Sequence, residues 1–495
     1  MQQSMQKVII VGGGTAGWMS AAFLAKVFAG QLAITVIESP DIPTIGVGEA
    51  TIPPIQLFNQ LLGVDEKSFM SACHATFKLG IQFEGWGNRS EQYMHAFGPC
   101  GEQMGMLPFY HYWLKARQHG SEASFNQFSL NYHAASQAHF SHEPLGNHQQ
   151  RLIYAYHFDA GAYARLLKDK AITMGVTYLS DHIAQVSLDT QSGEIAALHS
   201  REHGKLTADL YLDCSGQRAL LIGEALKVPY ESWQHWLPCD RALAVQLAEQ
   251  SALPYTRAIA QTAGWQWKIP LQHRVGAGLV YSSAHQNDDA ALKTLLANNQ
   301  TPAVSEPKLI RFTPGRRTNS WVKNCIALGL SGGFLEPLES TSLHMVQSAL
   351  IRLATLLSNT KPSKNQIEQY NRLTQIEAED VRDFIIAHYH VTANSHSAFW
   401  QDCQTMHIPH TLQERLELFR VSAYLPRHTQ ALFDDNAWSQ VLLGQGLIPT
   451  AQNLQTDKVP NEKLQLWLTQ LQQKNNHLAT TLPQHEAYIK NYCQA

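Results

Sequence analysis

Apolar residues near the start of the chain cluster in short blocks, and glycines separate these blocks. Residues Lys7–Val11 are mostly β-branched and end at glycine, which is typical of a parallel strand buried on both faces. Residues 18–28 are rich in Ala and Leu and predict a helix, and residues 32–37 predict a second strand. The order strand, glycine turn, helix and strand predicts a βαβ unit.

Other periodic patterns locate the remaining elements. Residues 77–83 alternate apolar and polar positions like a strand, and residues 264–281 are rich in strand-forming residues. Apolar residues at helical spacing predict an amphipathic helix through Leu343, Val346, Leu350, Leu353 and Leu357. Beyond residue 361 the pattern is helical, over residues 366–389, 412–423 and 464–471. A chain of 495 residues exceeds what one core usually serves, so we expect an α/β lobe over residues 1–355 and a mainly helical lobe over residues 356–495.

Composition narrows the class of protein. The formal net charge of −3 argues against a nucleic-acid partner, and no apolar stretch of about 18 residues predicts a membrane segment. Seven cysteines without a Cys-x-x-Cys pair are typical of reduced thiols, which predicts a cytoplasmic location. The 24 histidines lack the spacing of metal ligands, so no metal site is predicted.

The glycine turn after the first strand carries a dinucleotide-binding fingerprint. Gly12, Gly14 and Gly17 give Gly-x-Gly-x-x-Gly, and Glu38 follows 21 residues later (38 − 17 = 21), where about 20 are expected before a ribose-binding carboxylate. Gly12 permits the tight turn, Gly14 lets the backbone approach a pyrophosphate, and Gly17 lets the helix pack on the sheet. The phosphate charge would face the helix N-terminus. This pattern alone does not separate FAD from NAD.

Three further segments carry unusual sequences. Residues 265–270 read Trp-Gln-Trp-Lys-Ile-Pro, so two indoles project from one face of an extended segment, although an aromatic-rich core strand would look similar. Residues 75–78 read Ala-Thr-Phe-Lys, and residues 336–342 read Glu-Pro-Leu-Glu-Ser-Thr-Ser. Together with the fingerprint, these segments resemble the flavin-dependent halogenases of the tryptophan-halogenase family, over about residues 7–445.

The resemblance implies a two-site FAD-binding monooxygenase-like fold of the Rossmann type. An interleaved sheet would face the substrate, and the helical C-terminal lobe would complete the substrate pocket. Residues 45–53 resemble a loop that straps across FAD, and residues 210–216 resemble a second FAD contact. The residues that would bind the cofactor are Gly12, Gly14, Thr15, Ala16, Gly17, Glu38, Gly48, Glu49, Ala50, Asp213 and Leu330.

The resemblance also implies the chemistry. Reduced FAD, oxygen and chloride or bromide would form hypohalous acid, and the backbone amides of Thr341 and Ser342 would bind the halide at a helix start. Lys78 would hold the acid by a hydrogen bond or carry the halogen as an N-haloamine. Glu339 would accept the ring proton or position Lys78 or the acid. The alternatives are a solvated lysine whose stem covers apolar surface and a glutamate that only stabilises a helix start.

The resemblance places the substrate beside Lys78. Lining residues would be His95, Phe97, Trp265, Trp267, Ile269 and Pro270. Members that act on free tryptophan clamp it with a tyrosine pair, and this chain contains no Tyr-Tyr dipeptide. A zwitterion without polar partners binds poorly, so an indole or another electron-rich aromatic is predicted rather than free tryptophan.

The expected partners are a small aromatic substrate, a separate NAD(P)H-dependent flavin reductase and, by default, a second copy of the chain in a homodimer. An external reductase is expected because no second Rossmann fingerprint occurs. Two alternatives stay open. One is a single-component FAD-dependent aromatic hydroxylase, and the other is a non-catalytic flavin-binding protein.

Overall fold

A computed structural model describes residues 6–41, 48–87, 91–146, 149–248, 251–299, 301–426 and 431–494. The chain divides into two units, and each unit is assembled from three segments. Unit 1 comprises residues 1–75, 158–235 and 311–379, and unit 2 comprises residues 76–157, 236–310 and 380–495. The predicted division into lobes at residue 355 stays a prediction.

The predicted amino-terminal strands lie inside a six-stranded sheet of unit 1, in the order β20-β21-β12-β1-β2-β8. Strand β1 runs parallel to both of its neighbours, β2 and β12. Its central residues are buried, as expected for a strand covered on both faces. The bounds are β1 Lys7–Val11, β2 Ala33–Glu38, β8 Thr177–Ser180, β12 Leu210–Asp213, β20 Trp321–Val322 and β21 Cys325–Ala327.

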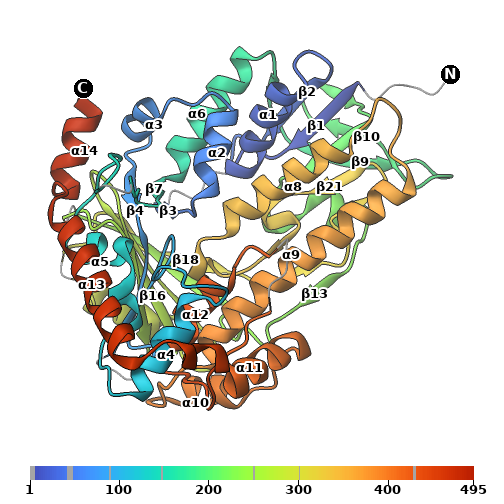
Figure 1. Cartoon of the computed structure of the whole chain (residues 1–495). Coiled ribbons are helices and arrows are strands. Elements are labelled where there is room, and N and C mark those ends of the chain that lie inside the picture. Colours follow the sequence, from blue (N-terminus) through green and yellow to red (C-terminus); the bar gives the residue numbers. More distant parts are fainter. Residues whose placement is uncertain are drawn as a thin grey trace. The chain divides into compact units, whose positions relative to one another are not determined.

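Helices α1 (Thr15–Val27), α6 (Ala160–Thr173) and α8 (Ser342–Leu356) belong to the same unit, and α1 packs beside both of the others (Figure 1). Helix α1 begins three residues before the predicted start at residue 18. Its first turn consists of Thr15, Ala16 and Gly17, which are too small or polar to add to an apolar pattern. Helix α8 buries Leu343, Val346, Leu350 and Leu353, as the predicted amphipathic face requires.

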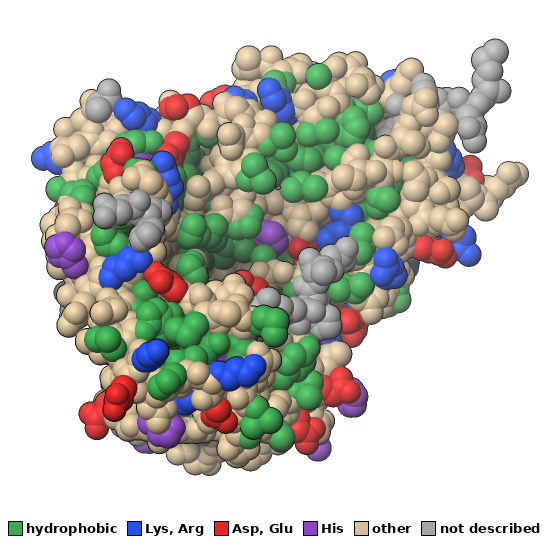
Figure 2. All heavy atoms as spheres, in the orientation of Figure 1, with side chains coloured by type: hydrophobic (Ala, Val, Ile, Leu, Met, Phe, Trp, Pro, Cys, Tyr) green, Lys and Arg blue, Asp and Glu red, His purple; other side chains and the backbone are tan. Residues whose placement is uncertain are grey.

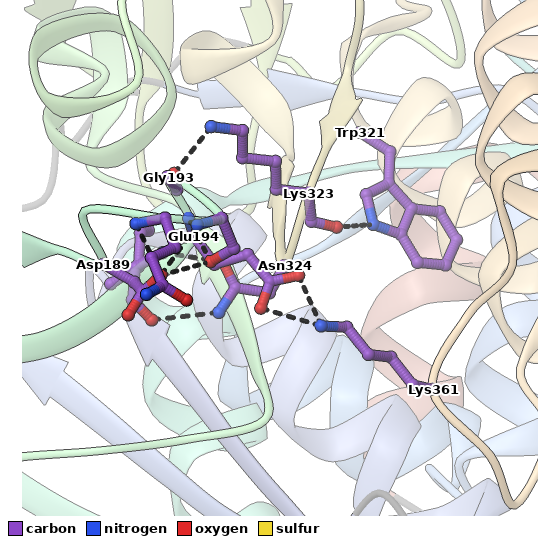
Figure 3. Close-up of polar contacts among 10 residues, drawn as sticks. Asp189, Gly193, Glu194, Trp321, Lys323, Asn324 and Lys361 are labelled. Atoms are coloured by element: carbon purple, nitrogen blue, oxygen red, sulfur yellow. Dashed lines mark hydrogen bonds and ion pairs between the residues drawn. The ribbon is translucent and has the colours of Figure 1, made fainter.

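The turn that leads into β21 is anchored to the hairpin of β9 (Ile183–Leu188) and β10 (Ile195–Ser200), as Figure 3 shows. The Lys323 ammonium donates to the Gly193 carbonyl at 2.8 Å, and Lys361 pairs with Glu194 at 2.6 Å. The side-chain amide of Asn324 accepts a hydrogen bond from the Ile195 N–H at 2.9 Å and donates one to the Ile195 carbonyl at 3.0 Å. The contacts of Lys323 and Asn324 fix the entry into β21, and the chain continues from this strand to the segment around Glu339.

Unit 2 contains a seven-stranded sheet in the order β18-β14-β17-β16-β15-β5-β6. Adjacent strands with a described register are antiparallel, except β15 and β5, which are parallel. The bounds are β5 Gly80–Glu84, β6 Gln92–Ala96, β14 Arg241–Leu247, β15 Thr256–Gln261, β16 Gly264–Pro270, β17 Val275–Tyr281 and β18 Lys308–Arg311. The strand-rich pattern over residues 264–281 is therefore confirmed as β16 and β17.

The segment 77–83, expected to be one strand, is divided at Leu79. Strand β4 (Thr76–Lys78) pairs with β7 (Ala155–Asp159), whereas β5 pairs with β6 and β15. The Leu79 amide donates to the Pro254 carbonyl at 2.7 Å, and its carbonyl accepts from the Phe97 amide at 2.8 Å. The apolar alternation continues through both strands, so it gives no sign that the chain changes sheets.

Past residue 356 the described residues form helices and no strands, so the predicted helical C-terminal region is confirmed. These helices are α9 Lys364–His390, α10 Ala398–Thr405, α11 His410–Ser422, α12 Asp435–Gly444, α13 Asn461–Thr480 and α14 His485–Gln494. Within the described ranges, none of the helices is long and apolar enough to cross a bilayer. On the face in Figure 2, cationic and anionic side chains are mixed.

Candidate functional site

The glycines of the fingerprint have different surroundings in unit 1. A Cβ on Gly12 would lie 2.1 Å from the Cys214 carbonyl oxygen, and Gly12 has φ +115°, which L side chains rarely adopt. A Cβ on Gly17 would lie 1.9 Å from the Gly12 carbonyl oxygen. Gly14 differs, because a Cβ there meets nothing within 4 Å. Two of the glycines are thus required by packing inside the protein, and Gly14 faces open space.

This open space lies at the first turn of α1. Gly14 is the N-cap of α1 and supplies no side chain to satisfy the first amides of the helix. The first turn itself also holds no acidic residue, so no side chain of that turn competes with an anion for the positive end of the helix dipole. A pyrophosphate needs close backbone approach and free amides, so these residues fit the phosphate part of FAD.

Glu38 ends β2 next to the glycine turn, and a lysine engages it. The Lys168 ammonium of α6 lies 3.0 Å from the Glu38 carboxylate and 3.5 Å from the Tyr178 ring centroid. Burial lowers the pKa of Lys168, but hydrogen bonds to Tyr178 and Glu38 outweigh it, so the pKa lies above its usual value. No motif in the sequence marks Lys168 as a partner of Glu38, because α6 begins more than 100 residues after Glu38.

Asp213 ends β12 and organises the loop that follows. Its buried carboxylate accepts from the amides of Leu221 and Ile222 at 2.8 Å each, and from the Ser215 amide and hydroxyl at 3.0 and 2.6 Å. Both carboxylate oxygens are thus used by the chain's own donors. The predicted FAD role of Asp213 stays a prediction, and this geometry favours an action through loop conformation.

Replacing Asp213 with asparagine should destabilise the protein by about 1–3 kcal/mol, because an amide NH₂ would face backbone N–H donors. Thermal unfolding measures the loss. Asp169→Asn, at an exposed position of α6, is the matched control and should leave the melting temperature unchanged. Equal melting temperatures for Asp213→Asn and the wild type would contradict this role.

A second loop reaches the same sheet edge. The Ser331 hydroxyl lies within hydrogen-bonding distance of the carbonyls of Asp213 and Leu328, and a Cβ on Gly329 would lie 2.9 Å from the Ala16 side chain. The turn Gly329–Ser331, which contains Leu330, therefore adjoins both the start of α1 and the end of β12. The carboxyl ends of parallel strands are where open α/β sheets bind nucleotides.

The segment after this turn carries the predicted glutamate. Glu339 is 1% exposed and ends the short helical turn Pro337–Glu339. Ser340 follows with φ +59°, and Ser342 begins α8 with Thr341 as N-cap. The Thr341 side chain makes no capping hydrogen bond, contrary to the usual role of threonine there. The first amides of α8 lie outside the helical bonding pattern, which fits a small anion.

Gly48, Glu49 and Ala50 form strand β3 (Gly48–Ala50), and their FAD role stays a prediction. Residues 45–47 of the expected strap lie outside the described residues.

Lys78 lies in unit 2 and is completely buried, at 0% exposure. The solvated alternative is therefore wrong. Its ammonium lies 5.2 Å from the ring centroid of Phe97, a cation–π distance. Burial disfavours the ammonium form of a lysine, and the aromatic face partly compensates. The structure thus brings one predicted pocket residue against the predicted catalytic amine.

His95 and Phe97 share one side of the chain because strand residues alternate in direction. The His95 ring lies 5.5 Å from Phe384 and 6.2 Å from Phe433, and the last two rings stack at 3.8 Å. Phe384 and Phe433 therefore form an aromatic wall beside His95. Phe384 and Phe433 are residues that sequence reasoning missed, since no motif marks them.

The side chains on the two faces of β16 make different contacts. The Trp265 and Trp267 rings lie 6.2 Å apart on one face, and Gly278 opposite Trp267 leaves room for the indole, since a Cβ there would lie 2.1 Å from the ring. On the other face, the amide of Gln266 and the ammonium of Lys268 bind the end of helix α7 (Asp288–Ala297). Burial lowers the pKa of Lys268. The α7 contacts thus fix the strand from behind the indoles.

Comparison with known proteins identifies the family. The sequence matches the tryptophan halogenase family over residues 7–461. The 7-chloro-L-tryptophan 6-halogenase KtzR of Kutzneria sp. (strain 744) is 34% identical over 97% of this chain and 98% of its own length. A flavin-dependent halogenase structure from Xanthomonas campestris is 44% identical and has a TM-score of 0.96, with 99% of each chain covered. BrvH, a flavin-dependent halogenase from Brevundimonas sp. BAL3, is 38% identical and has a TM-score of 0.94, again with 99% of each chain covered.

These matches confirm the predicted α/β fold and the predicted cofactors FAD, halide and oxygen. They also favour halogenation over the hydroxylase and the non-catalytic flavin protein. The chain belongs to the tryptophan halogenase family and is a flavin-dependent halogenase.

Proposed function

We propose that the enzyme halogenates an indole or another electron-rich aromatic ring held beside Lys78. The observation that carries this proposal is the complete burial of the Lys78 amine against the Phe97 ring. A buried amine can retain an oxidised halogen that would diffuse away from an exposed one. Family membership indicates the type of reaction, and the buried amine indicates where the halogen is transferred to the substrate.

The proposed reaction replaces an aromatic C–H bond with a carbon–halogen bond. Halide and reduced FAD each give up two electrons, and oxygen takes up four and leaves as two waters. Bound reduced FAD, with oxygen, supplies the oxidising power that turns halide into hypohalous acid. Lys78 then holds the oxidised halogen at Nζ, and Glu339 accepts the proton that the ring carbon loses.

The remaining site residues bind and separate the reactants. The glycine turn, Glu38 and the loops after β12 and β21 hold FAD, and the amides of Thr341 and Ser342 hold the halide. The indoles of Trp265 and Trp267, with Ile269 and Pro270, keep organic substrate away from the flavin. His95 and Phe97, with the aromatic wall of Phe384 and Phe433, hold the substrate ring against Lys78.

Two observations bear on substrate choice in opposite directions. KtzR, a 7-chloro-L-tryptophan 6-halogenase, and RebH, a tryptophan 7-halogenase, are 34% and 31% identical to the chain, which argues for tryptophan. The chain lacks a Tyr-Tyr dipeptide, and the rings of Phe384 and Phe433 lie beside His95. We therefore propose that uncharged indoles are preferred over free tryptophan.

Indole should be halogenated with a kcat/KM at least about tenfold above that of free tryptophan, since unpaired charges of the amino acid lose hydrogen bonds with water. The assay contains enzyme, FAD, a flavin reductase, NADH and chloride or bromide, and mass spectrometry detects the product. Catalase removes free peroxide as a control. A higher kcat/KM for tryptophan would contradict the preference, and no organic halide from any aromatic would contradict the function.

Halogenases of this kind need a separate flavin reductase and an aromatic substrate. We propose a freely diffusing NAD(P)H-dependent reductase and a homodimer, which the solution mass of the purified enzyme tests. The cytoplasmic location expected from the cysteine pattern stays a prediction.

A further inference from the structure

Buried polar groups hold the strand of Lys78. Thr76 and Lys78 lie two residues apart on β4, so their side chains share one face. His157 lies opposite Thr76 in the β4–β7 register. All three residues are completely buried, at 0% exposure. Three polar side chains without access to water need defined hydrogen-bond partners.

The hydrogen bonds form a chain with a defined direction. The Thr76 hydroxyl donates to the Pro270 carbonyl at 2.8 Å. A hydroxyl has one proton, so its 3.0 Å contact with His157 Nδ1 must be accepted by Thr76 and donated by the ring. In a neutral ring Nε2 is then the acceptor, and the Thr256 hydroxyl donates to it at 2.9 Å. The contacts thus select one tautomer of His157.

Burial keeps His157 neutral. It lowers the pKa of His157 well below the usual value, and the nearby charges of Lys78 and His485 lower it further.

His485 holds the same strand from another side. Its Nε2 accepts from the Phe77 amide at 3.2 Å while Nδ1 contacts the Ala252 carbonyl at 2.6 Å. Burial lowers the pKa of His485 to about 4.

The chain of bonds joins strands that carry the reaction. Pro270 is the last residue of β16, which bears the two indoles, and Thr256 is the first residue of β15, which pairs with β16. Thr76 lies on the lysine strand. One imidazole therefore links the lysine strand to the indole strand through its two ring nitrogens.

We infer that the Thr76–His157–Thr256 hydrogen-bond chain sets the position of the Lys78 amine relative to the indole strand, and that His157 is a positioning residue for halogen transfer. This inference rests on the proposed function of Lys78. A displacement of about 1 Å in a catalytic group can cost about a hundredfold in rate. An amine out of position would let hypohalous acid escape before it meets the substrate.

The test measures where the oxidised halogen goes. A small 1,3-diketone in solution scavenges escaping hypohalous acid, and mass spectrometry separates the scavenged product from the halogenated indole. Thr76→Val keeps the volume of the side chain and removes its hydroxyl. The variant should consume reduced FAD at the wild-type rate, while the ratio of halogenated indole to scavenged halogen falls about tenfold.

Three further variants make the test specific. Thr76→Ser restores the hydroxyl and should return the ratio to within about twofold of wild type. Thr256→Val leaves the Thr76–Pro270 bond intact and should lower the ratio in the same direction, so it serves if Thr76→Val does not fold. Thr456→Val removes an equally buried hydroxyl, bonded to the Asn453 carbonyl at 2.7 Å, and should leave the ratio unchanged.

The outcomes are distinguishable. A lowered ratio in the valine variants with serine rescue supports the inference. An unchanged ratio overturns it, as does a parallel fall of both products and of flavin consumption, which a general loss of structure would cause. A wild-type enzyme that halogenates no aromatic would instead overturn the proposed function.

Discussion

Lys78→Met should reduce halogenation at least about a thousandfold while the protein still folds and binds FAD. Methionine resembles lysine in length and suits a completely buried position, so the variant removes the amine and keeps most of the side-chain volume. Steady-state halogenation of indole measures the loss. Flavin fluorescence quenching measures FAD binding, for which the proposed residues belong to unit 1.

A matched control separates chemistry from burial. Lys115 is also buried, at 4% exposure, and its ammonium donates to the carbonyls of Thr456 and Val459 at 2.8 Å each. Lys115→Met should lower the melting temperature and keep halogenation within about twofold of wild type, because its amine serves two backbone carbonyls and the Asp457 carboxylate at 3.9 Å, none of which is a proposed site residue. If the Lys78→Met variant retained more than about a tenth of the wild-type halogenation activity, Lys78 would be excluded from the mechanism.

Gly14→Ala should weaken FAD binding about tenfold to a hundredfold without lowering the stability of the protein alone. The added methyl group meets no protein atom within 4 Å, so it enters only the space where the pyrophosphate is proposed to lie. Titration with FAD and thermal unfolding in its absence measure the two effects separately.

Gly12→Ala provides the contrast, since its Cβ would lie 2.1 Å from the Cys214 carbonyl and its φ of +115° disfavours alanine. That variant should lose stability even without FAD, by about 2 kcal/mol or more. Unchanged FAD affinity in Gly14→Ala would show that the open space at the start of α1 is not the phosphate site.

The sequence was sufficient for features that depend on local chemistry. Short β-branched strands and a glycine at each close approach of the backbone mark the βαβ unit. Short sequence motifs that resemble those of the family contain the buried lysine and the two tryptophans. The start of α1 and the break at Leu79 were missed, because small residues add nothing to an apolar pattern and alternation does not reveal which sheet a strand joins.

Features that depend on distant contacts were not predictable. Lys168 reaches Glu38 across 130 residues. Phe384 of α9 and Phe433, which precedes α12, reach His95 from segments with no motif of their own. Asp213 was expected to contact FAD, because an acid at the end of a strand suggests a ligand. The structure shows its oxygens occupied by donors of the following loop. Spacing along the chain does not reveal such internal partners.

The interleaving of the units has a consequence for how the enzyme is made. The six-stranded sheet of unit 1 takes strands from residue 7 to residue 327, and unit 2 continues to the carboxyl terminus. During synthesis, unit 1 cannot be completed before residue 379 has been made, and unit 2 cannot be completed before the end of the chain, although domains generally fold as units. A gene cut at any single position would therefore divide at least one unit, and a cut between residues 76 and 379 would divide both. Shuffling pockets between relatives must exchange several separate stretches of sequence together.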